Sequence, residues 1–173
     1  MAMMRLYKLI GNDLNYWETN DKGKRTAVIH WGIIGQPGQN KEIKSGIFSS
    51  LKKMVQKEID AKLKEGYTEF EDDDYAFLEI EYMIDGFGIE KDIDKRHRLE
   101  DKIAEVLALT GLGYTNGGSF GRGTMDAGCI VVDFNIAKKV IEEALVNTEF
   151  ADYLRIFRMD INETTDLPPQ AIR

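Results

Sequence analysis

The sequence predicts an α+β protein made of two units, and three observations support this. In residues 5–44, apolar and polar side chains alternate along short runs separated by turn residues, which is typical of an antiparallel meander. After Ser45 the apolar period changes from two to 3.6 residues, which indicates a helix. From residue 76 onward, strand-like and helix-like runs alternate, and an acidic stretch at 68–75 separates the two patterns.

The first expected unit, residues 1–70, begins with four strands. Their sequences are RLYKLIG, LNYWETN, KRTAVIHWGIIG and KEIKS, and the segments between them carry Gly, Asn, Asp or Pro. These residues tolerate the backbone angles of tight reversals. Because neighbouring residues of a strand face opposite sides, we expect Tyr16 opposite Trp17 and His30 opposite Trp31. Trp17 is interpreted as a core residue.

One long helix follows the strands and is expected to run from Ser45 to Gly66. Its apolar stripe consists of Phe48, Leu51, Val55, Ile59 and Leu63, with lysines around the rest of the surface. Beyond it, residues 71–74 are four consecutive acids. Their spacing is too tight for one helical face, so a solvated linker is favoured over a metal site.

The second expected unit, residues 71–160, alternates strands with helices of roughly 92–110 and 136–146. Asp133 stands where a cap for the second helix is needed. A short strand beside the Gly-rich segment would complete the order β-α-β-β-α-β, which is the ferredoxin-like split βαβ arrangement. Residues 161–173 have no periodicity and contain two prolines, so a loose tail is expected.

The net charge of −7 is unevenly distributed. Residues 1–70 carry 12 Lys and Arg against 8 Asp and Glu, a balance of +4. Residues 71–173 carry 11 against 22, a balance of −11. An anionic partner is therefore expected on the first unit, and a protein partner is expected for the acidic second unit.

Several classes of function are disfavoured by the composition. No apolar run approaches the roughly 18 residues that a membrane-spanning helix needs. A single cysteine, Cys129, cannot form an internal disulfide, and we predict a buried structural thiol in a cytoplasmic protein. The two histidines, His30 and His97, are far apart in sequence, so we expect them to form no metal site with the cysteine. We therefore predict no enzymatic activity, no metal and no cofactor.

The motifs of the first unit resemble those of the WGR domain family. From Arg5 to Tyr67 the chain carries RLYKLIG, then NYWE, then HWGIIGQPGQ, then a lysine-rich helix ending in KLKEGY. Family members carry the same motifs in the same order, with Trp-Gly-Arg at the signature. Here Trp31 and Gly32 match the signature, while Ile33 replaces its arginine. The replacement removes a guanidinium that can bind phosphate bidentately.

The resemblance implies nucleic-acid binding, since the family's best-understood members bind DNA near strand breaks. DNA ends and 5′-phosphates are therefore the expected ligands. The tryptophan of the signature packs against the nucleic acid there, and basic side chains meet phosphate. Carried over, the expected interface consists of Trp31, Gly32, Lys24, Arg25, Lys41 and Lys44. From the residues alone, Trp31 is better explained as a core residue beneath the helix, and with the resemblance the two interpretations are equally supported.

Two other functions stay open. The chain is alternatively a protein-interaction adaptor or inhibitor with no nucleic-acid role, and a homodimer would fit such a protein. A weaker alternative is a small-ligand site at the Gly-rich loop 111–123, although this loop leads into a strand and not into a helix N-terminus. Phe120 and Arg122 in that loop are the expected partner contacts.

Overall fold

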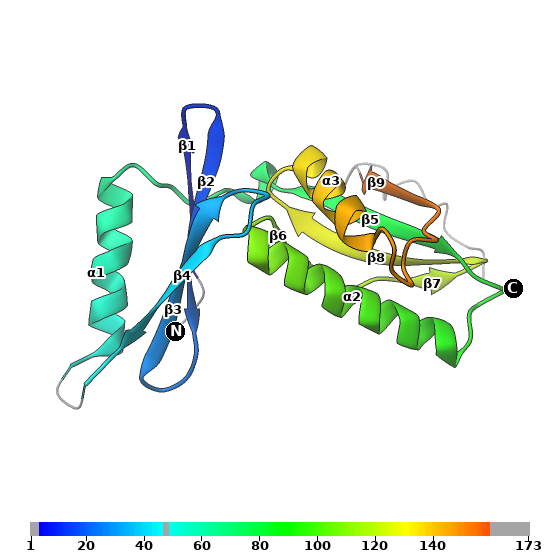
Figure 1. Ribbon diagram of the computed structural model, residues 1–173, viewed down its shortest axis with the longest axis horizontal. Helices are drawn as coiled ribbons and strands as arrows, with labels where there is room; N and C mark the ends of the chain where they lie inside the picture. The colour runs from blue at the N-terminus through cyan, green and yellow to red at the C-terminus, as the bar shows by residue number, and fades with distance from the viewer. Residues whose placement is uncertain (1–3, 47–48, 160–173) are drawn as a thin grey trace, which may run out of the picture. The chain divides into compact units, whose positions relative to one another are not determined.

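The computed structural model describes residues 4–46 and 49–159, and it confirms an α+β protein with three α-helices and two sheets (Figure 1). The chain divides into two compact units. Unit 1 comprises Met1–Tyr75 together with Ala104–Gly113, and unit 2 comprises Ala76–Ile103 with Tyr114–Arg173. Residues 104–113, expected in the second unit from their place in the chain, thus belong to unit 1. The expected loose tail, 161–173, lies outside the described residues.

Unit 1 contains a four-stranded antiparallel meander in the order β1-β2-β3-β4. The strands are β1 (Met4–Ile10), β2 (Asp13–Asp21), β3 (Thr26–Ile33) and β4 (Gln39–Lys44). The turns between them contain glycines at positive φ, for example Gly23 at 131° and Gly35 at 83°. Glycine adopts such angles without the steric cost that other residues incur, so these turns follow directly from the sequence.

Helix α1 (Leu51–Lys64) begins later than the sequence predicts. The side chain of Ser50 accepts a hydrogen bond from the backbone N–H of Lys53, so Ser50 is the N-cap. The helix therefore starts at Leu51, six residues beyond the predicted Ser45. The helix ends before Gly66, whose φ is +87°. Phe48 of the predicted stripe lies outside the described residues, and Leu63 is 46% exposed.

The sheet of unit 1 carries buried residues on both faces. On the α1 face, a core of seven buried residues forms: Leu6, Trp17, Ala27, Ile29, Ile43, Val55 and Ile59. On the other face Tyr16, Glu18 and His30 are buried. The predicted opposite placement of Tyr16 and Trp17, and of His30 and Trp31, is confirmed by the cross-strand pairs Trp17–Trp31 and Glu18–His30.

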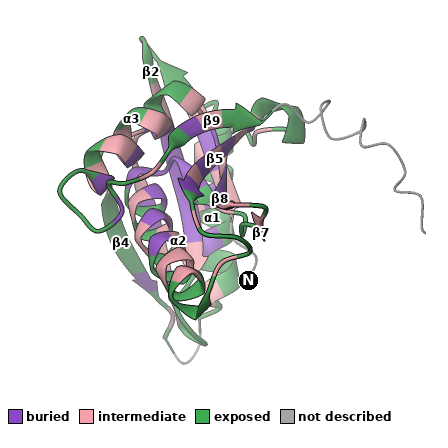
Figure 2. Ribbon diagram, turned by 90° about the vertical axis from the view of Figure 1, so that its right-hand side faces the viewer, coloured by how far each residue is buried: buried purple, intermediate pink, exposed green. Residues whose placement is uncertain are grey.

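Unit 2 is built on a second antiparallel sheet in the order β6-β8-β5-β9, and β7 pairs with β8. The elements in this part of the chain are β5 (Ala76–Met83), α2 (Glu90–Thr110), β6 (Gly113–Thr115), β7 (Phe120–Gly121), β8 (Thr124–Val131), α3 (Phe134–Leu145) and β9 (Arg155–Met159). The end of α2, from Ala104 on, and the first residue of β6 belong to unit 1. Figure 2 shows buried residues along β5 and β8 and on the turns of α2. On β5 they alternate, so Leu78 is buried while the neighbouring Glu79 is only half-buried.

The predicted cap of the second helix is confirmed, because the Asp133 carboxylate accepts a hydrogen bond of 2.9 Å from the backbone N–H of Ile136. The acidic run forms an exposed 3-10 turn, η1 (Asp72–Asp74). Among the described helices, none is long and apolar enough to cross a membrane.

Candidate functional site

Trp31 lies at the mouth of an opening on the α1 face of the unit 1 sheet. Its ring is half-buried and packs on the edge of the core, beside its fully buried cross-strand partner Trp17. The opening has a volume of about 260 Å³. Its lining comes from β2, β3, β4 and α1 and consists of Trp17, Trp31, Lys41, Glu58, Ala61, Lys62 and Glu65. Trp31 is thus both a core residue and an accessible aromatic surface.

The charges around this opening, hereafter the Trp31 opening, are balanced. Lys41 Nζ lies 3.0 Å from Glu58 Oε2, and Lys62 Nζ lies 2.6 Å from Glu65 Oε2. Lys62 also lies 5.2 Å from the centre of the Tyr67 ring, within cation–π distance. Two lysines and two glutamates therefore line the site, which makes it less basic than residues 1–70 as a whole.

The structure brings only some of the predicted interface residues together. Lys41 shares the Trp31 opening, whereas Lys24 and Arg25 are exposed in the turn between β2 and β3. At about 3.3 Å per residue, the strand from that turn to Trp31 spans roughly 17–20 Å. Lys44 lies near the turn, since the backbone N–H of Ser45 donates to the carbonyl of Arg25.

Lys44 is also engaged by a carboxylate. Its Nζ lies 2.9 Å from Glu42, which accepts a second contact of 2.8 Å from Lys22. Hydrogen bonds from Lys22 and Lys44 lower the pKa of Glu42 to about 2. A shallow depression of about 480 Å³ between β4 and α1 is lined by Lys41, Glu42, Ile43, Lys44, Met54, Lys57 and Glu58. Lys41 and Glu58 line both this depression and the Trp31 opening.

Gly32, the second signature position, faces away from the Trp31 opening. A β-carbon at residue 32 would lie 3.1 Å from the Gly38 Cα and 3.2 Å from the Tyr16 ring. Gly38 is tighter still, because a β-carbon there would lie 1.9 Å from the Tyr16 hydroxyl and 2.9 Å from the Trp31 carbonyl. The glycines of the motif thus allow the turn to pack over Tyr16.

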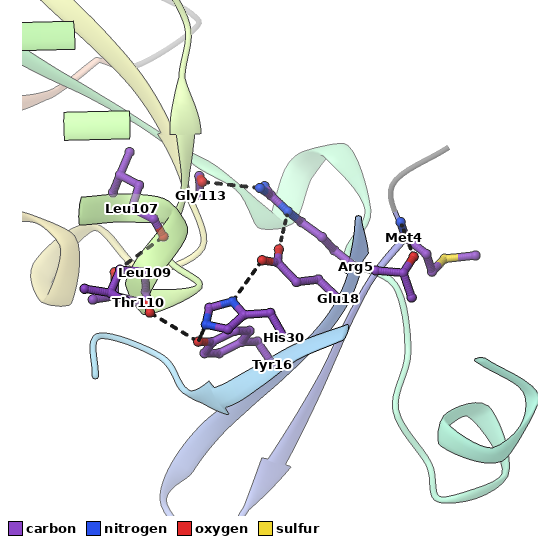
Figure 3. Close-up of polar contacts among 10 residues, drawn as sticks. Met4, Arg5, Tyr16, Glu18, His30, Leu107, Leu109, Thr110 and Gly113 are labelled. Atoms are coloured by element: carbon purple, nitrogen blue, oxygen red, sulfur yellow. Dashed lines mark hydrogen bonds and ion pairs between the residues drawn. The ribbon is translucent and has the colours of Figure 1, made fainter. Parts of the chain in front are cut away.

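A chain of buried polar side chains occupies that face (Figure 3). Arg5 Nε donates to Glu18 over 3.0 Å, and the other oxygen of Glu18 lies 3.1 Å from His30 Nδ1. The Tyr16 hydroxyl lies 3.0 Å from His30 Nε2. Burial, followed by the charge of Glu18, raises the pKa of Tyr16. Since Tyr16, Glu18 and His30 are at most 9% exposed, this polar chain holds unit 1 together and presents no group to a ligand.

The same face receives the C-terminal end of α2 (Figure 3). Figure 3 shows the Leu109 carbonyl accepting from the Tyr16 hydroxyl. Backbone N–H groups of Gly35 and Gly38 also donate to the carbonyls of Thr110 and Leu109, both over 3.0 Å. The last carbonyls of a helix have no partner within the helix, so these bonds satisfy groups that otherwise need water. Gly111 continues the contact at a φ of +67°, and a β-carbon there would lie 2.4 Å from the Tyr16 ring.

A second opening lies in unit 2 over β5, β8 and the Gly-rich segment, with a volume of about 380 Å³. Glu79 and Asp126 are neighbouring carboxyl groups in it. Burial, the charge of Asp126 and a hydrogen bond with Asp126 raise the pKa of Glu79 to about 7. Asp126 in turn accepts hydrogen bonds from the Ser119 N–H over 2.8 Å and from the Ser119 hydroxyl over 2.6 Å. Glu79 therefore holds its proton more strongly than an exposed carboxyl group does.

The predicted partner contacts of the Gly-rich loop differ in exposure. Arg122 is exposed and adopts a φ of +51° in the turn before β8. Phe120 is half-buried, with the Arg96 guanidinium 4.9 Å from its ring centre. Arg96 also donates to the Gly118 carbonyl over 2.7 Å. Of these two residues, Phe120 is thus packed by Arg96, whereas Arg122 is exposed.

Metal binding needs a cluster of ligating side chains, and thiol chemistry needs an accessible cysteine. Within residues 4–46 and 49–159, no group of three or more His, Cys, Asp or Glu side chains is placed to hold a metal ion. Cys129 is buried, as predicted, and burial together with the charges of Glu79 and Glu100 raises its pKa to about 12. Its thiol is therefore unreactive at neutral pH.

Sequence reasoning did not identify Glu58, Lys62 and Glu65 as part of the site. Their spacing of three and four residues does place them on one side of a helix, and this signal is present in the sequence. The sequence does not show how α1 is rotated about its axis against the sheet, because this rotation is set by the burial of Val55 and Ile59.

The fold and site define unit 1 as an antiparallel meander with one covering helix and a half-buried tryptophan at an opening of mixed charge. No family model, no curated protein and no solved structure matches the chain.

Proposed function

We propose that unit 1 is a WGR-like nucleic-acid-binding module, in which Trp31 is the stacking surface. The observation that carries the proposal is the half-buried ring of Trp31, which lines one opening together with Lys41 and Lys62. Stacking of a base on an aromatic side chain is worth about 1–3 kcal/mol and tolerates any base sequence. Lysines beside such a platform bind phosphates and position the strand without reading its sequence.

The depression next to the Trp31 opening extends this interface. Lys57 and Lys44 line it, and Lys41 lies on both. A sugar–phosphate chain that leaves Trp31 toward β4 would pass these lysines in turn. Lys24 and Arg25 then contribute at the far end, beyond Lys44. Affinity should fall steeply with salt, since each neutralised phosphate releases condensed cations.

A fluorescence titration with the full chain tests this proposal. Nicked duplex, blunt duplex and single-stranded DNA are compared in 50 and 200 mM KCl. Wild type should bind at least one of them with salt-dependent affinity, and Trp31→Ala should weaken binding by about 5- to 150-fold, the equivalent of one stacked base. Phe87→Ala is the matched control, because Phe87 is an aromatic residue of unit 2 that is 81% exposed.

Three results would contradict the proposal. The first is the absence of salt-dependent binding by the wild-type protein to all three DNA forms. The second is equal affinity of wild type and Trp31→Ala, with the variant shown to be folded by circular dichroism. The third is an equal loss of affinity in Trp31→Ala and Phe87→Ala, which would contradict a role specific to Trp31.

For unit 2 we propose a protein-binding role on a ferredoxin-like fold within a cytoplasmic protein. The strand order β6-β8-β5-β9 supports the fold, and the free, buried Cys129 is compatible with a reducing location. Met83, Phe87 and Ile89 support the role, since they are 66%, 81% and 64% exposed at the end of β5 and in the segment that leads from it to α2. A pull-down that loses its partner in Phe87→Ala supports this role, and unchanged capture contradicts it.

A small ligand at the Gly-rich loop is the second candidate function. The opening beside it, of about 380 Å³, presents Asn116, Ser119, Asp126 and the Gly117–Gly118 backbone around Glu79. Pockets for small molecules commonly combine apolar walls with a few polar groups in this way. Native mass spectrometry of the purified protein tests it: a bound small molecule that is lost in Asp126→Ala supports the site, and an unliganded mass contradicts it.

A further inference from the structure

Glu58 and Glu65 are the carboxylates that contact the two lysines of the Trp31 opening. Glu58 reaches from α1 to Lys41 on β4 over 3.0 Å. Glu65, at the end of α1, reaches back to Lys62 over 2.6 Å. All four side chains line the opening, so each carboxylate occupies the position in which a ligand phosphate would meet the same ammonium group.

The energetics of such pairs make them displaceable. The side chains of Lys41 and Glu58 are 47% and 37% exposed, and those of Lys62 and Glu65 are 26% and 51% exposed. Ion pairs with this exposure are weak, because water and salt screen them. A phosphate brings up to three acceptor oxygens, and the neighbouring phosphates along a strand add further negative charge. The lysines can therefore exchange a carboxylate for a phosphate, at a cost in affinity.

We propose that Glu58 and Glu65 act as internal competitors for Lys41 and Lys62 and thereby limit the affinity of the Trp31 opening for anionic ligands. This inference rests on the proposed function of unit 1 and assigns the residues that regulate it. In the free protein the opening is electrically balanced and holds no unpaired ammonium group among these two lysines. A single anion competes poorly with two carboxylates, whereas a strand that also stacks on Trp31 displaces them.

The test uses the full chain, with Glu58→Gln, Glu65→Gln and the double variant. Glutamine keeps the size and a hydrogen-bond acceptor but removes the charge. Each single variant should bind single-stranded oligonucleotide about 2- to 5-fold more tightly, which corresponds to the energy of an exposed ion pair. With a single-stranded ligand, the slope of log affinity against log salt should steepen by about 0.7 for each lysine that is released from its carboxylate.

Glu142→Gln is the matched control for the change of net charge. Glu142 also pairs with a lysine at close range, Lys138, but on α3 of unit 2. A gain in affinity equal to that of Glu58→Gln would show a general charge effect and would overturn the inference. A second control is a double-mutant cycle. In a Lys41→Gln background Glu58→Gln should no longer increase affinity, since its effect acts through Lys41.

The outcomes separate this inference from the proposed function. If wild type binds and the glutamine variants bind no more tightly, the inference fails and the proposed function stands. If wild type binds with measurable affinity and the double variant binds more tightly, both are supported, with the carboxylates as the inhibiting groups. If wild type binds none of the three DNA forms, both fail.

Discussion

Gly38 lies so close to Tyr16 that a β-carbon on residue 38 would stand 1.9 Å from the phenol oxygen. It would also stand 2.4 Å from His30 Nε2 and 2.9 Å from the Trp31 carbonyl. The first two atoms belong to side chains, but the third belongs to the backbone of β3. We therefore expect Gly38→Ala to lower the free energy of unfolding by roughly 1–3 kcal/mol, the usual cost of overpacking.

Urea denaturation followed by tryptophan fluorescence measures this effect. Gly46→Ala is the control in the same unit, because its nearest neighbour would be Ser49 Oγ at an ordinary 3.6 Å. Equal midpoints for the two variants would show that the turn relaxes without cost.

Arg5 and Glu18 form an ion pair with little exposure, 16% and 7% for the two side chains. Removing one partner of a buried pair leaves an uncompensated charge, at a cost of about 3–5 kcal/mol. We expect Arg5→Leu to approach the lower end of this range, since His30 also contacts Glu18. Arg155→Leu is the control: its partner is Glu81, but Arg155 is 59% exposed and the cost should stay below about 1 kcal/mol. Similar losses in both variants would contradict the distinction.

The two tryptophans differ in accessibility. Trp17 is 2% exposed, whereas Trp31 is half-buried at the opening. Iodide should therefore quench part of the fluorescence of wild type, and Trp31→Phe should leave an emission that iodide hardly affects. Quenching that persists unchanged in Trp31→Phe would mean that iodide reaches Trp17 and not Trp31, and the stacking proposal would lose its basis.

The strands of unit 1 were predictable because their signals are local. Alternating side chains and turn glycines are read within about ten residues, and cross-strand pairs such as Trp17–Trp31 follow from hairpin connections. The start of α1 was missed because the apolar period alone does not reveal that Ser50 caps the helix. The partners of Tyr16 near residue 109 were missed because a contact over such a separation leaves no local periodicity.

The candidate site was predictable to a similar degree. Trp31 and Lys41 lie on adjacent strands, so their meeting follows from the meander. Lys24 and Arg25 are near Trp31 in sequence but at the far end of β3, because an extended strand separates residues quickly. The two glutamates that neutralise the site come from α1, and its rotation against the sheet depends on packing.

Glu79 gives unit 2 a stability that depends on pH. Its pKa rises from 4.5 to about 7 in the folded protein, mainly through burial and then through Asp126. The protonated form is therefore favoured by folding, so the contribution is complete below pH 4.5 and is lost as pH rises toward 7. Because Glu79 is partly exposed, the loss should amount to about 1 kcal/mol after screening.

Glu79→Gln measures this contribution directly, because the amide retains a donor for Asp126 without titrating. Relative to wild type, the variant should gain stability between pH 5.5 and pH 8 in urea denaturation. A difference between the two proteins that stays constant over this range would contradict the raised pKa.

Asp133 caps α3 through its 2.9 Å bond to the Ile136 N–H. Loss of such a cap costs about 1 kcal/mol, so Asp133→Ala should lower the thermal midpoint by a few degrees. Asp133→Ser keeps an acceptor oxygen and should remain close to wild type. A serine variant as unstable as the alanine variant would show that the charge of Asp133 matters more than its hydrogen bond.

The hydrogen bonds from Gly35 and Gly38 to the end of α2 have a consequence for biosynthesis. Unit 1 includes Ala104–Gly113, so a nascent chain that has just emerged through Tyr75 still lacks part of its first folded body. The end of α2 can pack over Tyr16 only after the ribosome has added nearly forty more residues. A protein truncated after Tyr75 would leave Tyr16 and His30 open to water, so it would lack part of the folded unit 1 of the intact polypeptide.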